Sequence, residues 1–227
     1  MRRRFLSNIN KSISGGIDYY SEYFTIEALE DGLIAKLSKN ASEYRIDDGS
    51  WNTLSANTNT PSVNKGQTLS FKGSLTPNSS NSNGIGTFTI SKKCNVKGNI
   101  MSLLYGDNFE GQTDLSGKNY TFYKLFYNCK TIVDVSELIL PATTLANNCY
   151  SNMFSGCTNL ITAPELPATT LASQCYNYMF SGTNVLPDCS NIDFTNNAVV
   201  ASGGLKGLFA GTKVTDADLE RILPKNS

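Results

Sequence analysis

The amino-acid sequence predicts a mostly β chain of the α+β class, in which a small β-sandwich or barrel precedes a short solenoid of repeats closed by a C-terminal helix. Two features predict this fold: short alternating runs of polar and apolar residues in the first half, and a motif that recurs every 26 residues in the second. We therefore expect a flexible basic arm over residues 1–18, a β-rich docking domain over 19–108 and a repeat domain over 109–227.

The docking domain contains sequence patterns typical of strands and hairpins. Residues 23–29 and 33–37 flank Glu30-Asp31-Gly32, which predicts a strand, a tight turn and a second strand. A second hairpin of the same type is expected from residues 43–46 and 51–54. Two further strands are expected at 67–73 and 86–90, where polar and apolar residues alternate. Short strands with frequent turns are typical of a sandwich or small barrel.

The strongest signal is an internal repeat in the second half of the chain. The run Leu140-Pro141-Ala142-Thr143-Thr144-Leu145-Ala146 recurs as 166–172, and Met153-Phe154-Ser155-Gly156 recurs as 179–182, both at an offset of 26. Weaker copies lie before and after these two, at offsets of 28 and 29. About four copies are enough for a stack of repeats to bury its own core.

Each repeat is predicted to contain one helix and one extended segment. Leu145, Cys149 and Met153 are spaced by four residues, which places them on one face of a short helix that Gly156 would end at a C-cap position. The segment 157–166 is apolar at every third residue, which suits a short extended piece of chain. One helix and one extended segment in about 26 residues describe a leucine-rich-type repeat.

A closing helix is predicted near the C-terminus, over residues 215–224. Thr215 is a good N-cap residue, and Asp216 and Asp218 would lie in the positively polarised first turn. Pro224 would end the helix. Such a cap would cover the last apolar face of the repeat stack.

The second half also resembles a known repeat family. The pattern Cys-x-x-Leu-x-x-Ala-Pro-x-Leu-Pro-Ala-Thr-Thr-Leu-Ala-x-x-Cys-Tyr-x-x-Met-Phe-x-Gly, from Cys157 to Gly182, resembles the BspA-like leucine-rich repeats. These repeats occur in surface proteins of gut Bacteroidales and in proteins of their phages, including crAss-like phages. The resemblance covers about residues 118–212 and implies a binding scaffold with no catalytic residues.

The composition argues against most enzyme classes. The chain has no histidine, which removes the commonest general base and the commonest metal ligand. Its six cysteines form no Cys-x-x-Cys pair, and those in the repeats are interpreted as small buried apolar residues rather than as metal ligands. We expect a non-enzymatic protein with no cofactor and no metal, and a hydrolase built on paired carboxylates is the remaining enzymatic alternative.

Charge and hydropathy limit the possible partners and compartments. The 19 basic and 19 acidic residues cancel, so no nucleic acid partner is expected. Arg2, Arg3 and Arg4 are not followed by the apolar run of a signal peptide, and no stretch approaches the roughly 20 apolar residues of a membrane span. We therefore expect synthesis in the host cytoplasm and no membrane insertion.

Candidate binding residues lie in the arm, at the start of the first strand and in the third repeat. The arm is either a disordered tail or a docking segment that orders on a partner, and the tyrosines near residue 20 are either a contact patch or ordinary packing. Tyr178 stands where the preceding copy has Asn152, which favours an exposed contact. The candidates are Arg2, Arg3, Arg4, Phe5, Tyr19, Tyr20 and Tyr178. A calcium site at Asp107, Glu110 and Asp114 is a weaker reading than linker charge.

The expected function is that of a phage virion protein. The arm and the β-rich domain would dock on capsid or tail proteins, and the repeats would bind a host surface glycan, a host protein or a neighbouring virion subunit. Head-fibre, decoration and tail-associated roles stay open, as does assembly into a homo-oligomer. The alternative is a bacterial cell-surface adhesin or a fragment of one.

Overall fold

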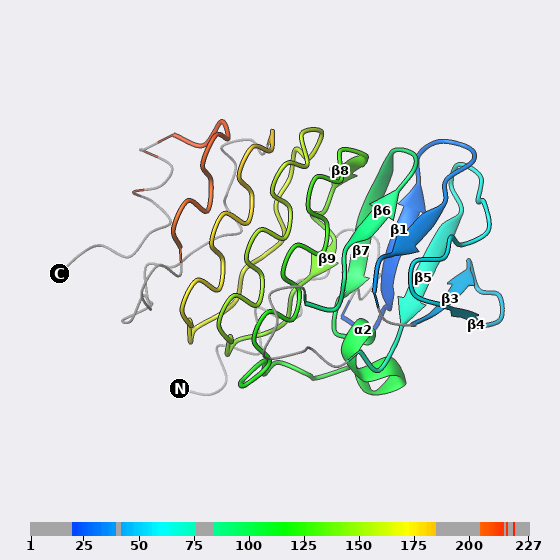
Figure 1. Cartoon of the computed structure of the whole chain (residues 1–227), viewed down its shortest axis with the longest axis horizontal. Coiled ribbons are helices and arrows are strands. Elements are labelled where there is room, and N and C mark those ends of the chain that lie inside the picture. The colour runs from blue at the N-terminus through cyan, green and yellow to red at the C-terminus, as the bar shows by residue number, and fades with distance from the viewer. Residues whose placement is uncertain are drawn as a thin grey trace.

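The computed structural model describes residues 20–39, 42–75, 84–184 and 205–215, together with Ala217 and Glu220. This part of the chain is mostly β, as the sequence predicts, and it contains one short α-helix, α2, before the repeats. Figure 1 shows the β-strands gathered at one end, with successive loops of chain stacked side by side from them in sequence order.

The strands form two sheets. The larger one has the order β4 (Asn52–Leu54), β3 (Ser42–Ile46), β5 (Thr68–Lys72), β1 (Phe24–Ala28), β7 (Cys94–Asn99) and β8 (Ile132–Asp134), and β9 (Leu138–Ile139) also pairs with β7. Pairs among the first five are antiparallel, whereas β7 pairs in parallel with β8 and β9. The smaller sheet pairs β2 (Ala35–Leu37) with β6 (Phe88–Ile90). The larger sheet thus contains strands from both of the segments that the sequence separates at residue 108.

One of the two expected hairpins is confirmed and the other is wrong. The strands β3 and β4 pair as an antiparallel hairpin. The strand β1, in contrast, lies between β5 and β7, while β2 pairs with β6 in the smaller sheet. The turn residues between β1 and β2 redirect the chain, but the amide of Leu33 then bonds to the carbonyl of Val63 at 3.0 Å. Turn chemistry therefore predicted the reversal of the chain and not the partner of the strand.

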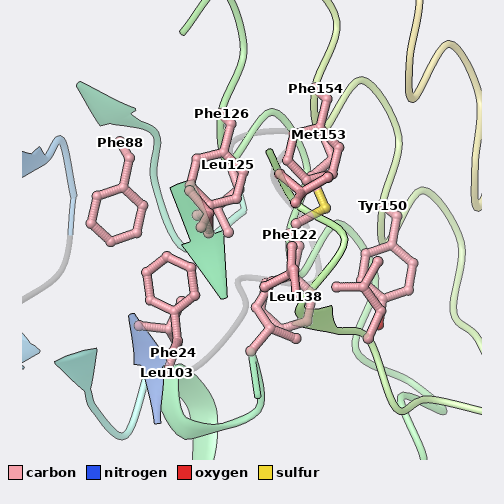
Figure 2. Close-up of a cluster of buried hydrophobic side chains, with 14 of the residues drawn as sticks. Phe24, Phe88, Leu103, Phe122, Leu125, Phe126, Leu138, Tyr150, Met153 and Phe154 are labelled. Carbon is pink, nitrogen blue, oxygen red and sulfur yellow. The ribbon is translucent and has the colours of Figure 1, made fainter. Parts of the chain in front are cut away.

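A continuous apolar core joins the two sheets and extends into the second half of the chain. The ring of Phe24 in β1 lies 5.9 Å from Phe71, 5.4 Å from Phe88 and 5.9 Å from Phe126, measured between centroids. Figure 2 shows Phe88, Phe126 and Phe154 following one another from the sheet into the stacked loops. The core therefore does not stop at the end of the β-rich segment.

A short helical segment fixes one end of the larger sheet. It consists of α2 (Ser102–Tyr105) and the 3-10 helix η1 (Gly106–Asn108). The buried hydroxyl of Ser102 donates to the carbonyl of Phe71 at 2.8 Å and accepts from the amide of Phe24 at 3.0 Å. Gly106 has φ of +54° and donates its amide to the carbonyl of Gly73 at 2.7 Å, which places Asp107 beside the end of β5.

The expected helix over residues 145–156 is wrong, because this stretch is a series of tight turns. Four such turn segments lie at residues 119–129, 147–157, 173–183 and 205–212. From Asn148 to Gly156, every even-numbered amide donates to a carbonyl of the next segment at 2.8–3.0 Å. Every odd-numbered amide from Cys149 to Cys157 donates to the carbonyl three residues before it. The backbone therefore bonds alternately within its own segment and to its neighbour.

A positive φ at every fourth residue makes this arrangement possible. In the second turn segment Asn148, Asn152 and Gly156 have φ of +56°, +56° and +78°. Asparagine and glycine tolerate this left-handed region better than other residues. The apolar residues of the segment consequently recur at a period of four, which resembles the helical period of 3.6 closely enough to mislead a reading of the sequence.

The extended part of each repeat follows the predicted burial. Leu160, Ala163 and Leu166 are all buried, and Thr144 makes parallel bridges to Asp114 on one side and to Thr170 on the other. At the C-terminus, Ala217 and Glu220 are helical, and the rest of the expected closing helix lies outside the described residues.

Candidate functional site

The structure places only some of the predicted binding residues. Arg2, Arg3, Arg4, Phe5 and Tyr19 lie outside the described residues. Tyr20 is half-buried, and its backbone carbonyl accepts a hydrogen bond from the side-chain amide of Asn99 at 3.0 Å. Tyr178 is 36% exposed and lies on the third turn segment.

The turn segments present one side to solvent, which we call the outer ribbon face. Two successive residues in every four point into the core, as Met153 and Phe154 do, and most of the others are half-buried or exposed. The outer ribbon face consists of exposed and half-buried side chains: Tyr123, Lys124, Tyr127, Asn152, Ser155, Gln174 and Tyr178. Its chemistry changes along the stack, from aromatic and basic in the first segment to small and polar in the second.

The first turn segment carries a cation between two aromatic rings. The ammonium of Lys124 lies 5.0 Å from the ring centroid of Tyr123 and 4.9 Å from that of Tyr127, within the range of a cation–π contact. Tyr120 packs edge-on against Tyr123 at 5.6 Å, and Tyr127 is 39% exposed. These contacts hold flat aromatic surfaces and one positive charge in fixed positions, as at many binding surfaces.

The third turn segment presents Tyr178 through an unusual backbone. Tyr178 has φ of +52° and donates its amide to the carbonyl of Lys206 at 2.9 Å. Its ring lies over Gly207, where any side chain would collide with the ring carbons. The tyrosine is exposed, as expected, and its role in binding stays a prediction.

Tyr150 and Tyr176 belong to the core, as their recurrence predicts. Both are fully buried, and their rings stack at 5.6 Å. Burial also raises the pKa of the cysteine thiols, that of Cys175 to about 11. The five cysteines of the described residues are all buried, which fits their interpretation as small apolar side chains. The sixth, Cys189, lies outside these residues.

The acidic residues considered for calcium are not brought together. Asp107 bonds to Lys72 at 2.9 Å, whereas Asp114 accepts from the amide of Ser116 at 2.7 Å. Within the ranges that the structure describes, no group of three or more acidic, cysteine or histidine side chains has the arrangement of a metal site.

Sequence reasoning missed a cluster of charged and aromatic side chains on the larger sheet. Trp51 lies 4.9 Å from Tyr23, 5.0 Å from the Arg45 guanidinium carbon and 4.6 Å from the Lys72 ammonium, measured from ring centroids. Burial, with a hydrogen bond to Asp107, raises the pKa of Tyr23 to about 12. The only signal in the sequence was the alternation along 43–46 and 67–73, which places Glu43, Arg45 and Lys72 on one face.

No protein-family model, curated protein or solved structure matches this chain. Among the helices of the described residues, none has the length and apolar character needed to span a bilayer.

Proposed function

We propose that this chain is a non-enzymatic structural or attachment protein of a phage virion, with a head-fibre, decoration or tail-associated role. Its arm and β-rich segment dock on capsid or tail proteins. Its second half is a leucine-rich-type repeat solenoid with a C-terminal cap helix, and this solenoid presents the outer ribbon face to a host surface glycan or protein.

The observation that carries this proposal is a stack of aromatic rings, which runs from β6 in the smaller sheet through the turn segments. Phe88, Phe126, Phe154, Phe180 and Phe209 follow one another at centroid separations of 5.3–5.7 Å, with interplanar angles of 16° or less. Each ring fills the space beside the next copy, so the second half is a rigid extension of the sheet. A rigid extension holds a binding surface at a fixed distance and direction from a docking site.

A second row of contacts supports the same rigidity. Phe122 stacks on Tyr150 at 5.5 Å, and Tyr150 stacks on Tyr176. Between the two rows, main-chain hydrogen bonds join each segment to the next, as Phe154 does to Met179 at 2.9 Å. Surfaces of this kind bind by burying area on a preformed scaffold, which limits the entropy lost on association.

The outer ribbon face has the composition of a contact surface. Tyrosine is enriched at protein interfaces because its ring buries a large area and its hydroxyl can still form a hydrogen bond. The stacked Tyr123, Lys124 and Tyr127 also suit the faces of sugar rings and the acidic groups of host polysaccharides. The polar Asn152 and Ser155 of the next segment extend the same face.

Protein mass spectrometry of purified particles tests the proposal directly. We expect to find the chain in purified virions of the phage that encodes it. Its ratio to the major capsid protein should stay constant across the fractions of a density gradient. Enrichment in the cell envelope of uninfected bacteria, with none in particles, would overturn the proposal and favour the adhesin alternative.

A further inference from the structure

A shallow groove lies at the end of the larger sheet, beside β3, β5 and η1. It offers about 300 Å³ of space, at the lower end of the range that small-molecule sites occupy. Its polar lining residues are Ser42, Glu43, Thr53, Lys72, Ser74 and Asp107. The groove belongs to the β-rich segment and shares no residue with the outer ribbon face.

The central cation of the groove is held in place from several sides. The ammonium of Lys72 lies 2.9 Å and 3.0 Å from the two carboxylate oxygens of Asp107 and 3.6 Å from that of Glu43. The ring centroid of Trp51 lies 4.6 Å from the same ammonium. Tyr23 in turn donates its hydroxyl to Asp107 at 2.8 Å. These contacts fix the polar groups before any ligand arrives, which favours binding.

The charges exclude two classes of ligand. An anion entering the groove would meet the carboxylates of Glu43 and Asp107, whose side chains are 48% and 63% exposed. A metal ion would meet the ammonium of Lys72, which already contacts both carboxylates. A neutral ligand avoids both repulsions and can donate to the carboxylate oxygens while it accepts from Lys72.

Hydroxyl groups complete the lining. Thr53 and Ser74 each add a hydroxyl that can donate or accept. Ser42, only 5% exposed, forms part of the wall, and its hydroxyl has no hydrogen-bond partner among the described residues.

We propose that this groove binds a neutral sugar residue of a glycan. Neighbouring hydroxyls of a pyranose donate to Glu43 and Asp107, and a third hydroxyl or the ring oxygen accepts from Lys72. A sugar carries closely spaced hydroxyl groups that donate and accept hydrogen bonds. The lining of the groove likewise places donors and acceptors close together. The inference gives the β-rich segment a binding role of its own, whatever the outer ribbon face contacts.

Nuclear magnetic resonance titration of the full-length, ¹⁵N-labelled chain tests the site. The probes are the methyl glycosides of glucose, galactose, mannose and N-acetylglucosamine. We expect at least one to shift the amide signals of residues 72–74 and 106–107 in a saturable manner. No shift at these residues with any of the four probes would overturn the proposal.

Variants separate the groove from nonspecific binding. Glu43→Gln removes a charged acceptor from a half-exposed position and should weaken binding of the active probe at least tenfold. Glu165→Gln, an exposed change on the repeats, should leave the affinity unchanged. Thr53→Val, which leaves the ion pairs intact, should weaken binding several-fold. Equal affinity in the wild type and Glu43→Gln would refute the site.

Methyl glucuronide tests the charge argument on its own. It differs from methyl glucoside by one carboxylate, which Glu43 and Asp107 should repel, so we expect weaker binding to the wild-type chain. Tighter binding of the glucuronide would show that the groove selects anions and would overturn the assignment to a neutral sugar.

Discussion

The larger sheet and the turn segments enclose one core with different backbone arrangements. In the sheet, β1 bonds to strands that are distant in sequence, such as β5, where Ser70 lies opposite Thr25 and 45 residues after it. In the second half, each turn segment bonds to the next one along the chain, as the amide of Tyr150 does to the carbonyl of Cys175. Strands need only alternation of polar and apolar residues, whereas the turns also need a left-handed residue at every fourth position. The two regions therefore place different demands on the sequence while sharing a core.

The largest expected effect tests whether the two regions unfold together. Phe154→Ala removes a fully buried ring that stacks on Phe126 and Phe180, so we expect a loss of about 3–5 kcal/mol in the free energy of unfolding. Trp51, the single tryptophan, lies on the sheet and reports unfolding there by its fluorescence. Urea titrations followed by fluorescence and by circular dichroism should shift equally, because the core is continuous.

Phe71→Ala is the matched change in the sheet, where its ring packs on Phe24 and Phe88. It should also lower the urea midpoints measured by fluorescence and by circular dichroism to the same extent. A fluorescence midpoint that stays in place in Phe154→Ala, while the circular dichroism midpoint falls, would show that the turn segments unfold separately from the sheet.

A smaller effect tests the left-handed positions of the turns. Asn152→Ala places a β-carbon that disfavours positive φ at a position with φ of +56°, which should cost about 1–2 kcal/mol. Asn152→Gly should stay within a few tenths of a kcal/mol of the wild type, because glycine adopts this region freely. Ser155→Ala, at a neighbouring position without positive φ, is the control. Thermal unfolding of the three variants gives the order, and an equal loss in the alanine and glycine variants at residue 152 would contradict this explanation.

The same positions explain what the sequence could and could not predict. Alternation predicted strands at 43–46, 67–73 and 86–90, and apolar spacing predicted the burial of Leu160 and Leu166. The helix was wrong because Cys149 and Met153 fit periods of 3.6 and 4 equally well. The series Asn148, Asn152 and Gly156 was a usable signal for the true period, because these residue types favour left-handed backbone.

The groove could not be predicted from the sequence, for a different reason. Glu43, Lys72 and Asp107 are distant along the chain, and they meet only because β3 pairs with β5 and η1 folds against the end of β5. Nothing local in the sequence specifies these pairings. The turn segments, whose alternate amides donate to the next copy, are largely free of this difficulty, which is why the repeat was the clearer of the two signals.

The smallest expected effect concerns pH and also distinguishes the two regions. Hydrogen bonds from Lys72 and Tyr23 hold the pKa of Asp107 below its usual value, and the amide of Thr68 does the same for Asp47. Both carboxylates lie beside the larger sheet, Asp47 just after β3 and Asp107 in η1, whereas residues 145–184 contain Glu165 as their single acidic residue.

Because these pKa values are lower in the folded chain than in the unfolded one, the carboxylates stabilise the fold fully above the unfolded value of about 3.9. This contribution is lost as the pH falls through the folded values. We expect urea midpoints of the wild type to fall between pH 5 and pH 3, and the fall to be smaller in a variant combining Asp47→Asn with Asp107→Asn. Glu165→Gln, an exposed change on the repeats, is the control. If the urea midpoint of the double variant fell with pH as much as that of the wild type, the acid sensitivity would arise from groups other than Asp47 and Asp107. The two regions would then not differ in how their charges contribute to stability.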